Sequence, residues 1–447
     1  MIEDSVPGDP EGLVILDCIT AESADALRGL KWANIQPGNE HLENTLLLTI
    51  RQRDLLNLPI WGDFFLLRPA PAWICFNLND SGAPAEGVEA TFVGLAGERE
   101  EAPLRLTLSD MRWASPQLQS LALLTGLSVR KQRILDVLEQ AAAKAGPSRW
   151  TVAYDVGQGN ANALVDEGGH PRLFYDLGWP TSFNARTRPA NRPALLAGDR
   201  CCSHDSLPAP VVLSHWDFDH WAFAVANTSY NFGKKAAHIT FDPLALQRYW
   251  IVPRPPTRYR GVGLGPTHLR FISQLGQRLV WPNRLRRVAF SAGVITRTDP
   301  VTDPYDRNNQ GLAWFVMENQ SAQTAILLPG DIEYAKLHWP ASAPDLLSLV
   351  ASHHGGRAGA PPMAAIPAAS HLTLSLGAGN VHRHPSAAAL RNHSLCGWPT
   401  PLSTSNRSTP PGSLLATGSV LIPLNPLALR PTFSCPTLIA SNLVPTQ

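Results

Sequence analysis

The sequence of 447 residues predicts an α/β fold, and three observations support this class. Short apolar runs follow one another after Gly146, and each ends at a turn or a polar cluster, as strands do. The segment from about Ser115 to Ala145 instead carries apolar residues at helical spacing and stops at Gly146-Pro147. Forty prolines spread along the chain argue against a bundle of long helices.

Two domains and a tail are expected from the changes in composition. Residues 1–147 should form an additional N-terminal α/β domain, residues 148–430 the main domain, and residues 431–447 a C-terminal tail. The N-terminal domain contains no motif that identifies a chemistry. Segment 1–149 has a net charge of −7 and the remainder +8, so this domain is a candidate for binding a protein partner or for masking a basic segment.

The main domain is expected to alternate strands with short helices. Helices should follow three polar clusters, at Trp221–Ala226, Ile332–Leu337 and Ser386–Asn392. A last edge strand is expected to begin at about Gly418. The other expected strands are Trp150–Tyr154, Leu173–Tyr175, Val211–Leu213, Leu312–Val316, Thr324–Leu328, Leu346–Val350 and Leu372–Leu376.

Several features concern the compartment in which the chain works. No run of 18 apolar residues occurs, so the sequence predicts no transmembrane helix and no membrane partner. The first residues, MIEDSVPGDPEG, are acidic and turn-forming, unlike a signal peptide. Six cysteines are scattered without a CxxC pair, which is typical of reduced thiols. We therefore expect a cytoplasmic protein.

Four side chains able to bind a metal lie within six residues, in the stretch VVLSHWDFDHW that begins at Val211. If the strand continues, alternate residues share a face, so that His215, Asp217 and Asp219 point the same way and His220 follows in a turn. A charged group in an apolar site is costly unless it is paired or bound to a cation. The spacing therefore predicts a metal site.

Further polar clusters follow other expected strands. Asp331 in LLPGDIE is by itself typical of a helix N-cap, but beside the first cluster it becomes a candidate bridging carboxylate. SHHGG supplies His353 and His354, NVHRHP contains His384, and the glycine-rich turn DVGQGNA follows the strand from Trp150. Sheets in α/β proteins place their sites at the carboxyl ends of strands, so one shared site is expected.

In this order, the motifs resemble those of metallo-β-lactamase-fold hydrolases of the ComEC-like subgroup, over about residues 150–425. HxDxDH is that subgroup's variant of the commoner HxHxDH. DVGQGNA is similar to the family's DVGQGDA, LFYDLG to a strand ending in Asp-Gly-Gly, LLPGDIE to LLTGDIE, SHHGG to HHGS, and GNVHRHP to a segment ending in GHP. Departures from the family pattern are Asn160 for Asp, Gly356 for Ser and Arg383 for Gly.

The resemblance implies an αββα sandwich with two divalent metal ions at one edge. Three carboxylates make the donor set harder than a His-rich one, so Mn²⁺ competes with Zn²⁺. His215 and Asp217 would hold one metal, Asp219 and His220 the other, and Asp331 would bridge them. The resemblance does not separate His353 from His354 as the remaining ligand. The expected metal ligands are therefore His215, Asp217, Asp219, His220, Asp331 and one of His353 and His354.

Catalytic roles follow from the same resemblance. Paired metals activate water at neutral pH and stabilise both oxygens of an in-line displacement, which gives Asp219 and Asp331 a catalytic role as ligands. His384 would donate to the scissile group or stabilise its developing charge.

The segment from Pro243 to Thr298 contains ten arginines, interleaved aromatic residues and no acidic residue. As an insertion beside the site, it would suit a polyanion such as nucleic acid, because guanidinium groups match phosphate oxygens and aromatic rings stack on bases. The alternative is an Arg-rich surface that pairs with the acidic N-terminal domain. DRNNQ is similar to the family's Asn-Asn-x-Ser stretch. The expected substrate-binding residues are Asn309, Arg254, Arg258 and Arg260.

Together these features predict a metal-dependent phosphodiesterase, with a nuclease as the first hypothesis. The rival among enzymes is a small phosphoester or lipid-headgroup esterase. A different class is a non-catalytic module with a structural metal, whose N-terminal domain binds a protein partner. A strong salt dependence of affinity would favour nucleic acid, whereas retained metal without turnover would favour the module.

Overall fold

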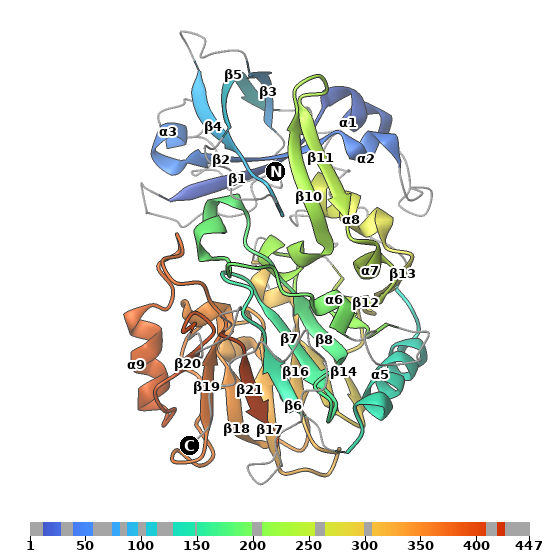
Figure 1. The fold of residues 1–447 in the computed structure, drawn as a ribbon, viewed down its shortest axis with the longest axis vertical. Helices are drawn as coiled ribbons and strands as arrows, with labels where there is room; N and C mark the ends of the chain where they lie inside the picture. Colours follow the sequence, from blue (N-terminus) through green and yellow to red (C-terminus); the bar gives the residue numbers. More distant parts are fainter. Residues whose placement is uncertain are drawn as a thin grey trace.

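A computed structural model describes residues 12–27, 39–56, 74–80, 87–96, 104–113, 128–147, 150–198, 208–254, 264–298, 306–407 and 418–424. These residues form a five-stranded sheet, two seven-stranded sheets and a two-stranded hairpin, together with short helices (Figure 1). The predicted α/β class is confirmed at this coarser level. No helix in this part of the chain combines the length and the apolar character that crossing a membrane requires.

The N-terminal unit, residues 12–113, is an antiparallel sheet in the order β1-β2-β4-β5-β3. Its edge strand β1 places alternate residues on opposite faces. Three short helices accompany the sheet. The elements are β1 (Leu13–Ile19), α1 (Ala21–Leu27), α2 (Glu40–Glu43), β2 (Thr45–Arg51), α3 (Gln52–Leu56), β3 (Ile74–Asn79), β4 (Val88–Phe92) and β5 (Arg105–Trp113).

The first seven-stranded sheet has the order β13-β12-β9-β8-β7-β6-β21. β8, β9, β12 and β13 run parallel to one another, so that β8 and β9 end at the same edge of the sheet. The predicted last edge strand is confirmed, because β21 pairs with β6 at the sheet margin. The strands are β6 (Trp150–Ala153), β7 (Ala161–Val165), β8 (Pro171–Leu177), β9 (Val211–Val212), β12 (Tyr249–Val252), β13 (Gln277–Val280) and β21 (Val420–Pro423).

The second seven-stranded sheet follows chain order from β14 to β20. Its first half is antiparallel, whereas β17, β18, β19 and β20 are parallel and send their carboxyl ends to one edge. The strands are β14 (Arg287–Phe290), β15 (Gly293–Arg297), β16 (Leu312–Val316), β17 (Thr324–Leu328), β18 (Asp345–Val350), β19 (His371–Leu374) and β20 (Leu402–Ser403).

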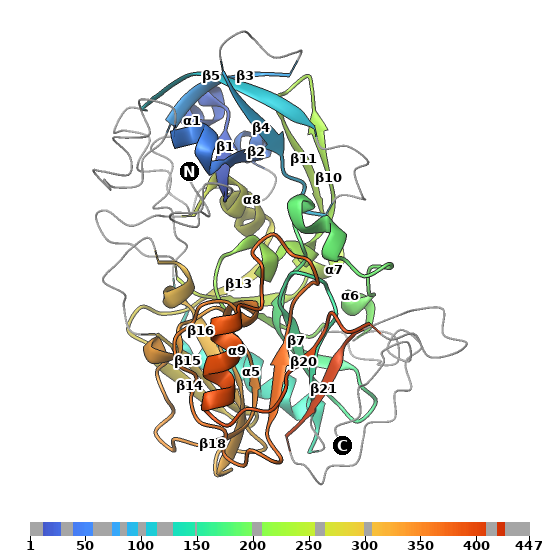
Figure 2. The ribbon, with the colours of Figure 1, turned by 90° about the vertical axis from the view of Figure 1, so that its left-hand side faces the viewer.

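The two seven-stranded sheets pack against each other through one apolar core. Tyr175 of the first sheet and Trp314 of the second belong to this core, and the Tyr175 hydroxyl donates to the Leu312 carbonyl at 2.7 Å. Short helices and loops cover the outer faces, among them α6 (Leu195–Gly198), α7 (Pro243–Leu246), α8 (Pro266–Gln274) and α9 (Ala387–Leu395). The layered arrangement is seen from a second side in Figure 2.

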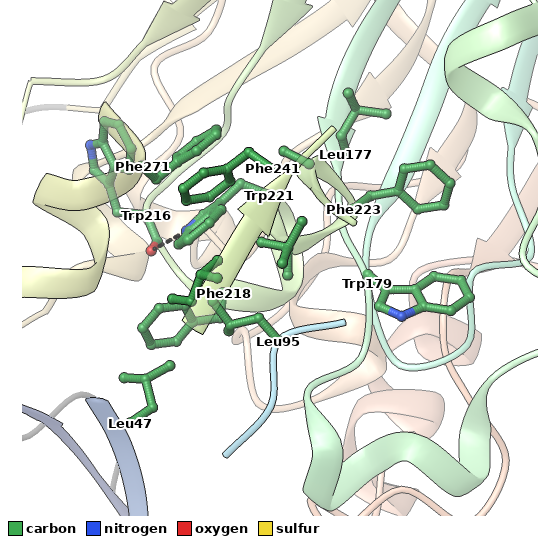
Figure 3. Close-up of a cluster of buried hydrophobic side chains, with 14 of the residues drawn as sticks. Leu47, Leu95, Leu177, Trp179, Trp216, Phe218, Trp221, Phe223, Phe241 and Phe271 are labelled. Atoms are coloured by element: carbon green, nitrogen blue, oxygen red, sulfur yellow. Dashed lines mark hydrogen bonds between the residues drawn. The ribbon is translucent and has the colours of Figure 1, made fainter. Parts of the chain in front are cut away.

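The N-terminal unit is docked on the two-sheet unit rather than tethered beside it. β11 (Ala236–Phe241) of the hairpin with β10 (Val225–Asn231) contacts β2, and α8 contacts both β1 and β2 (Figures 1 and 2). A continuous apolar cluster joins the two units. Figure 3 shows Leu47 and Leu95 of the N-terminal unit in that cluster with Phe218, Trp221 and Phe223.

Three local predictions are corrected by this arrangement. The long helix appears as α5, which begins only at Lys131, and residues 114–127 lie outside the described residues. α5 packs on β8 and β14, so it belongs to the two-sheet unit and the boundary near 147 is too late. In place of the expected helices, segment 221–226 contains a 3-10 turn and the start of β10, and segment 332–337 contains a 3-10 turn, because Trp221 and Ile332 turn into the core. The third expected helix is α9.

The Arg-rich segment 243–298 is not an insertion. β12 and β13 extend the first sheet, and β14 and β15 form the start of the second. Several of its guanidinium groups are buried on backbone carbonyls of other elements. Arg248 is fully buried and donates to the carbonyls of Leu244, Ala209 and Leu196, and Arg270 donates to those of Glu43 and Ala237.

Candidate metal centre

The loop after β9 carries the first group of candidate ligands. β9 ends at Val212, and a 3-10 turn spans Phe218–His220, so the expected extended strand does not continue through the motif. The turn folds the chain back on itself and brings the ring centroids of His215 and His220 to 4.0 Å. The sequence motif therefore forms one cluster, but through a turn rather than through strand alternation.

The remaining candidates arrive from the parallel half of the second sheet. Asp331 follows β17, His353 and His354 follow β18, and His384 lies beyond β19. The loop that carries Asp331 approaches the β9 loop very closely, because a Cβ built on Gly330 would lie 2.6 Å from the Cβ of Ser214. Gly330 also has a φ of +60°, so glycine is required here both for space and for conformation.

Two groups of side chains bring potential ligand atoms within 4.8 Å of one another. The first consists of His215, His220 and Asp331, and the second of Asp219, His220 and His354. His220 belongs to both groups, and Asp331 Oδ1 lies 3.2 Å from its Nε2. Asp331 Oδ2 lies 3.9 Å from the Nε2 atoms of both His215 and His353. Asp331 is thus the central carboxylate of the cluster.

Within the described residues, three buried imidazole nitrogens of this cluster make no hydrogen bond of good geometry: Nε2 of His215, His220 and His354. A carboxylate oxygen nevertheless lies 3.1–3.2 Å from each of them. Buried polar atoms normally have a partner, and imidazole nitrogens and carboxylate oxygens that converge at this spacing are the ligand atoms that a divalent cation uses. The donor set therefore fits divalent metal ions.

The other ring nitrogens fix the tautomers. His220 Nδ1 lies 2.8 Å from Asp176 Oδ2, and His354 Nδ1 lies 2.6 Å from the Ser375 carbonyl oxygen. Both partners can only accept, so each Nδ1 carries the proton. In the neutral imidazole the lone pair is then on Nε2, which faces the cluster, as metal-binding histidines require.

Asp176 is a functional residue that the sequence analysis quoted in LFYDLG without giving it a role. It is fully buried and accepts from the Ser214 N–H at 2.6 Å and from Asn160 Nδ2 at 2.9 Å, besides His220. Asn160 stands where the resembled family has Asp. Its amide donates to the Asp176 carboxylate, which a second carboxylate could not do without binding a proton.

The electrostatics of the cluster couple its acids to its bases. Burial alone would raise the pKa of Asp331, but His220, His354 and His353 hold it well below its usual range. Burial alone would lower the pKa of His220, but Asp331 and Asp176 raise it well above its ordinary value. The pKa of His354 is raised in the same way, by Asp331 and Asp219 against burial. The carboxylates thus favour the protonated, positively charged forms of His220 and His354.

Two expected ligands lie at the margin of the cluster. Asp217 Oδ2 is 3.2 Å from His215 Nε2, and its Oδ1 is 3.9 Å from Arg307 Nε. His353 is the less enclosed of the adjacent histidines, with 35% of its side chain exposed against 3% for His354. The geometry therefore favours His354 as the ligand of the second group and leaves His353 on the wall of the pocket.

A pocket of about 60 Å³ opens over the cluster. His384 lines it, and burial, followed by His353, His354 and His382, lowers the pKa of His384 to about 3, so this imidazole is neutral at pH 7. Asn380 holds the His384 backbone, accepting from its N–H and donating to its carbonyl. Besides the carboxylates and histidines, the pocket is lined by the apolar Ile15, Phe183 and Phe218 and by Gln158, Thr181, Asn184 and Arg307.

Of the four predicted substrate-binding residues, those that the structure describes do not line this pocket. Asn309 is buried and structural: its amide donates to Asp306 at 2.6 Å and accepts from the Glu333 N–H at 2.8 Å. Its neighbour Arg307 lines the pocket instead. Arg254 does not line it, and Arg258 and Arg260 lie outside the described residues.

Comparison of the chain with protein-family models, with curated proteins and with solved structures returns no match.

Proposed function

We propose that the chain is a metal-dependent hydrolase of phosphoesters, built on the metallo-β-lactamase plan, with two divalent cations, Zn²⁺ or Mn²⁺. The observation that carries the proposal is the set of three buried Nε2 atoms, of His215, His220 and His354, each of which faces a carboxylate oxygen at 3.1–3.2 Å. Two face-to-face seven-stranded sheets with helices outside, and ligands gathered at strand ends, support the sandwich that the motifs imply.

Within this proposal, His215, Asp217 and Asp331 would hold one cation, and Asp219, His354 and Asp331 the other, with His220 beside both. When bound, the cations would activate water and stabilise the oxygens of the scissile group. Asp176 orients His220 by holding its Nδ1 proton.

Two residues on the pocket wall would act on the substrate itself. Arg307 brings a guanidinium group to a pocket otherwise rich in carboxylates, so it would attract and orient an anionic group. His384 is a neutral imidazole, and its buried Nδ1 makes no hydrogen bond within the described structure. A neutral imidazole can donate one hydrogen bond to the leaving oxygen or to the developing negative charge.

One observation favours a small ester over a nucleic-acid polymer. The arginines on which the prediction of a polyanionic substrate rests include Arg248 and Arg270. The guanidinium groups of these two residues donate hydrogen bonds to buried backbone carbonyls. A polymer would need exposed cations that follow its backbone beyond the scissile phosphate. We therefore place the small phosphoester first and keep the nuclease as the second candidate.

The test is hydrolysis by metal-stripped protein to which Mn²⁺ or Zn²⁺ is returned. The substrates are p-nitrophenyl phosphate, bis-p-nitrophenyl phosphate, single- and double-stranded DNA, and RNA. Asp331→Ala and Asp219→Ala should lose turnover, whereas Asp345→Ala, an exposed carboxylate at the amino end of β18, should keep it. Each outcome separates the candidates. Cleavage of the small esters alone supports our ranking, and cleavage of polymers reverses it. Two bound metals with no turnover of any substrate would identify a metal-stabilised binding module.

A further inference from the structure

One wall of the pocket comes from the N-terminal unit, far away in the sequence. Ile15 of β1 is 5% exposed and lines the same pocket as Asp219, Asp331 and His354. Alternate residues of a strand share a face, so Ile15 and Asp17, which contacts Thr267 of α8, both point toward the two-sheet unit, and Leu16 lies on the opposite face of β1. The N-terminal sheet thus contributes a side chain to the candidate site.

The position of this wall is fixed by buried polar contacts. Asp17 is fully buried and accepts from the Thr267 N–H at 3.0 Å and from the Thr267 hydroxyl at 2.7 Å, at the first turn of α8. The next residue, His268, is also fully buried; its Nε2 contacts the Trp216 carbonyl, between the candidate ligands His215 and Asp217. β1 is therefore connected through α8 to the metal-binding loop.

A second connection lies on the other side of the pocket. The Ser182 N–H donates to the Gly94 carbonyl at 2.8 Å, and the Gly94 N–H donates to the Ser182 hydroxyl at 3.1 Å. The residue after Ser182 is Phe183, which also lines the pocket. Leu95, next to Gly94, is buried in the cluster of Figure 3. The wall is thus a built surface and needs no closing movement to form.

The chemistry of this wall differs from that of the pocket floor. Ile15, Phe183 and Phe218 are the apolar side chains of a lining that otherwise consists of carboxylates, imidazoles, Arg307 and the polar Gln158, Thr181 and Asn184. Ligand pockets commonly enclose about 300–1,000 Å³ and orient a ligand with a few polar groups among apolar ones. The pocket here, of about 60 Å³, is much smaller than that range.

We infer that Ile15 is a specificity-determining residue, which selects phosphoesters whose group next to the scissile phosphorus is small and apolar. This inference rests on the proposed function for the phosphoryl group, but the wall itself can be tested without turnover. The N-terminal unit is then part of the active site and sets the substrate size.

The test measures the binding of methylphosphonate, phenylphosphonate and 1-naphthylphosphonate to the full-length, Mn²⁺-loaded protein by calorimetry. Turnover of p-nitrophenyl phosphodiesters with the same three groups is measured in parallel. Ile15→Ala should raise the affinity for the naphthyl compound relative to the methyl compound by about tenfold, since pocket methylenes discriminate at that level. Ile15→Phe should weaken phenyl binding and leave methyl binding unchanged.

Leu16→Ala is the matched control, because it removes a similarly buried side chain from the opposite face of the same strand. It should leave the naphthyl-to-methyl ratio unchanged. If Ile15→Ala does not fold, Ile15→Val should shift the ratio in the same direction by a smaller factor.

The outcomes separate the inference from the proposed function. A naphthyl-to-methyl affinity ratio that changes in Ile15→Ala, without turnover by the wild type, supports the role of Ile15 and contradicts the proposed hydrolase activity. Turnover together with the same naphthyl-to-methyl affinity ratio in wild type, Ile15→Ala and Leu16→Ala supports the hydrolase activity and contradicts the role of Ile15. Failure of all three phosphonates to bind the metal-loaded wild type also overturns the inference.

Discussion

The Nδ1 atom of His220 lies 2.8 Å from Oδ2 of Asp176, and both side chains are fully buried. Asp176 accepts a hydrogen bond from His220 Nδ1, from the Ser214 N–H and from Asn160, so its two oxygens serve three donors. The aspartate thereby fixes the β9 loop and turns His220 Nε2 toward Asp331. The ligand cluster depends on a carboxylate that is not itself in contact with the pocket.

Replacing this carboxylate should therefore weaken metal binding. Asp176→Asn leaves one acceptor oxygen for three donors, so we expect about a 10- to 100-fold loss of affinity for Mn²⁺ or Zn²⁺. The measurement is competition with a metal-sensitive dye. Asp166→Asn is the control, because Asp166 also faces a histidine, His170 at 3.1 Å, but lies at the other end of β7. Equal losses in the two variants would contradict the orienting role.

Metal binding should release protons at neutral pH. Against the effect of burial, Asp331 and Asp176 raise the pKa of His220 well above its ordinary value, so a metal must compete with a proton for Nε2. Affinity should therefore rise with pH. Calorimetric titration at pH 7 in two buffers of different ionisation enthalpy counts the protons. Tight binding with no proton release would contradict this prediction.

The same shifts have consequences for the stability of the metal-free protein. The raised pKa values of His220 and His354 add stability below their ordinary value of 6.5, which is lost as the pH rises through the folded-state values. The lowered pKa of Asp331 adds stability above its ordinary value of 3.8, which is lost as the pH falls. Because metal competes with the protons on these histidines, adding metal should raise the unfolding temperature more at alkaline than at mildly acidic pH.

The strands were predictable because each is a short apolar run closed by a turn. The predicted Leu312–Val316 and Thr324–Leu328 coincide with β16 and β17. The helix expected at Trp221–Ala226 was wrong, since the apolar residues of this segment enter the core and Val225 already begins β10. A continuous apolar segment gives no periodicity by which the two alternatives could be distinguished.

The sequence predicts the candidate ligands of the site, which lie in motifs, but not the other residues that line the pocket. The sequence places His215 and His220 in one motif, but the wall residue Ile15 is 200 residues away from His215 and belongs to no motif. The expected role of Asn309 was wrong, because its amide pairs with Asp306 and with the backbone of Glu333. The contact with Glu333 joins residues 24 positions apart, and such a contact leaves no signal in a single sequence.

Gly356 makes room for His384. A Cβ built at this position would lie 2.7 Å from His384 Nε2, and here the resembled family has Ser. We expect Gly356→Ser to displace the imidazole and to lower turnover by about 10²-fold while metal content stays constant. Gly276→Ala is the control, because nothing lies within 4 Å of the added Cβ. Retained activity in Gly356→Ser would show that His384 can move aside without losing its role.

Substituting Arg248 distinguishes a structural role of the Arg-rich segment from a role in binding polyanions. Its guanidinium group donates to the Leu244 and Ala209 carbonyls at 2.9 Å and to the Leu196 carbonyl at 2.6 Å. Arg248→Met would leave these buried acceptors without their donor, so we expect a loss of about 3 kcal/mol in the free energy of unfolding, measured in urea. Arg287→Met removes an exposed arginine from β14 and should cost less than about 0.5 kcal/mol.

The same two variants test nucleic-acid binding, through the dependence of DNA affinity on salt concentration. An exposed arginine that contacts phosphate contributes about one unit to the slope of log affinity against log salt, whereas a buried one contributes nothing. We expect folded Arg248→Met to keep the wild-type slope, because its charge never reaches the surface. A reduced slope in Arg248→Met alone, with unchanged stability, would return this arginine to the substrate-binding surface and restore the polymer as the first substrate.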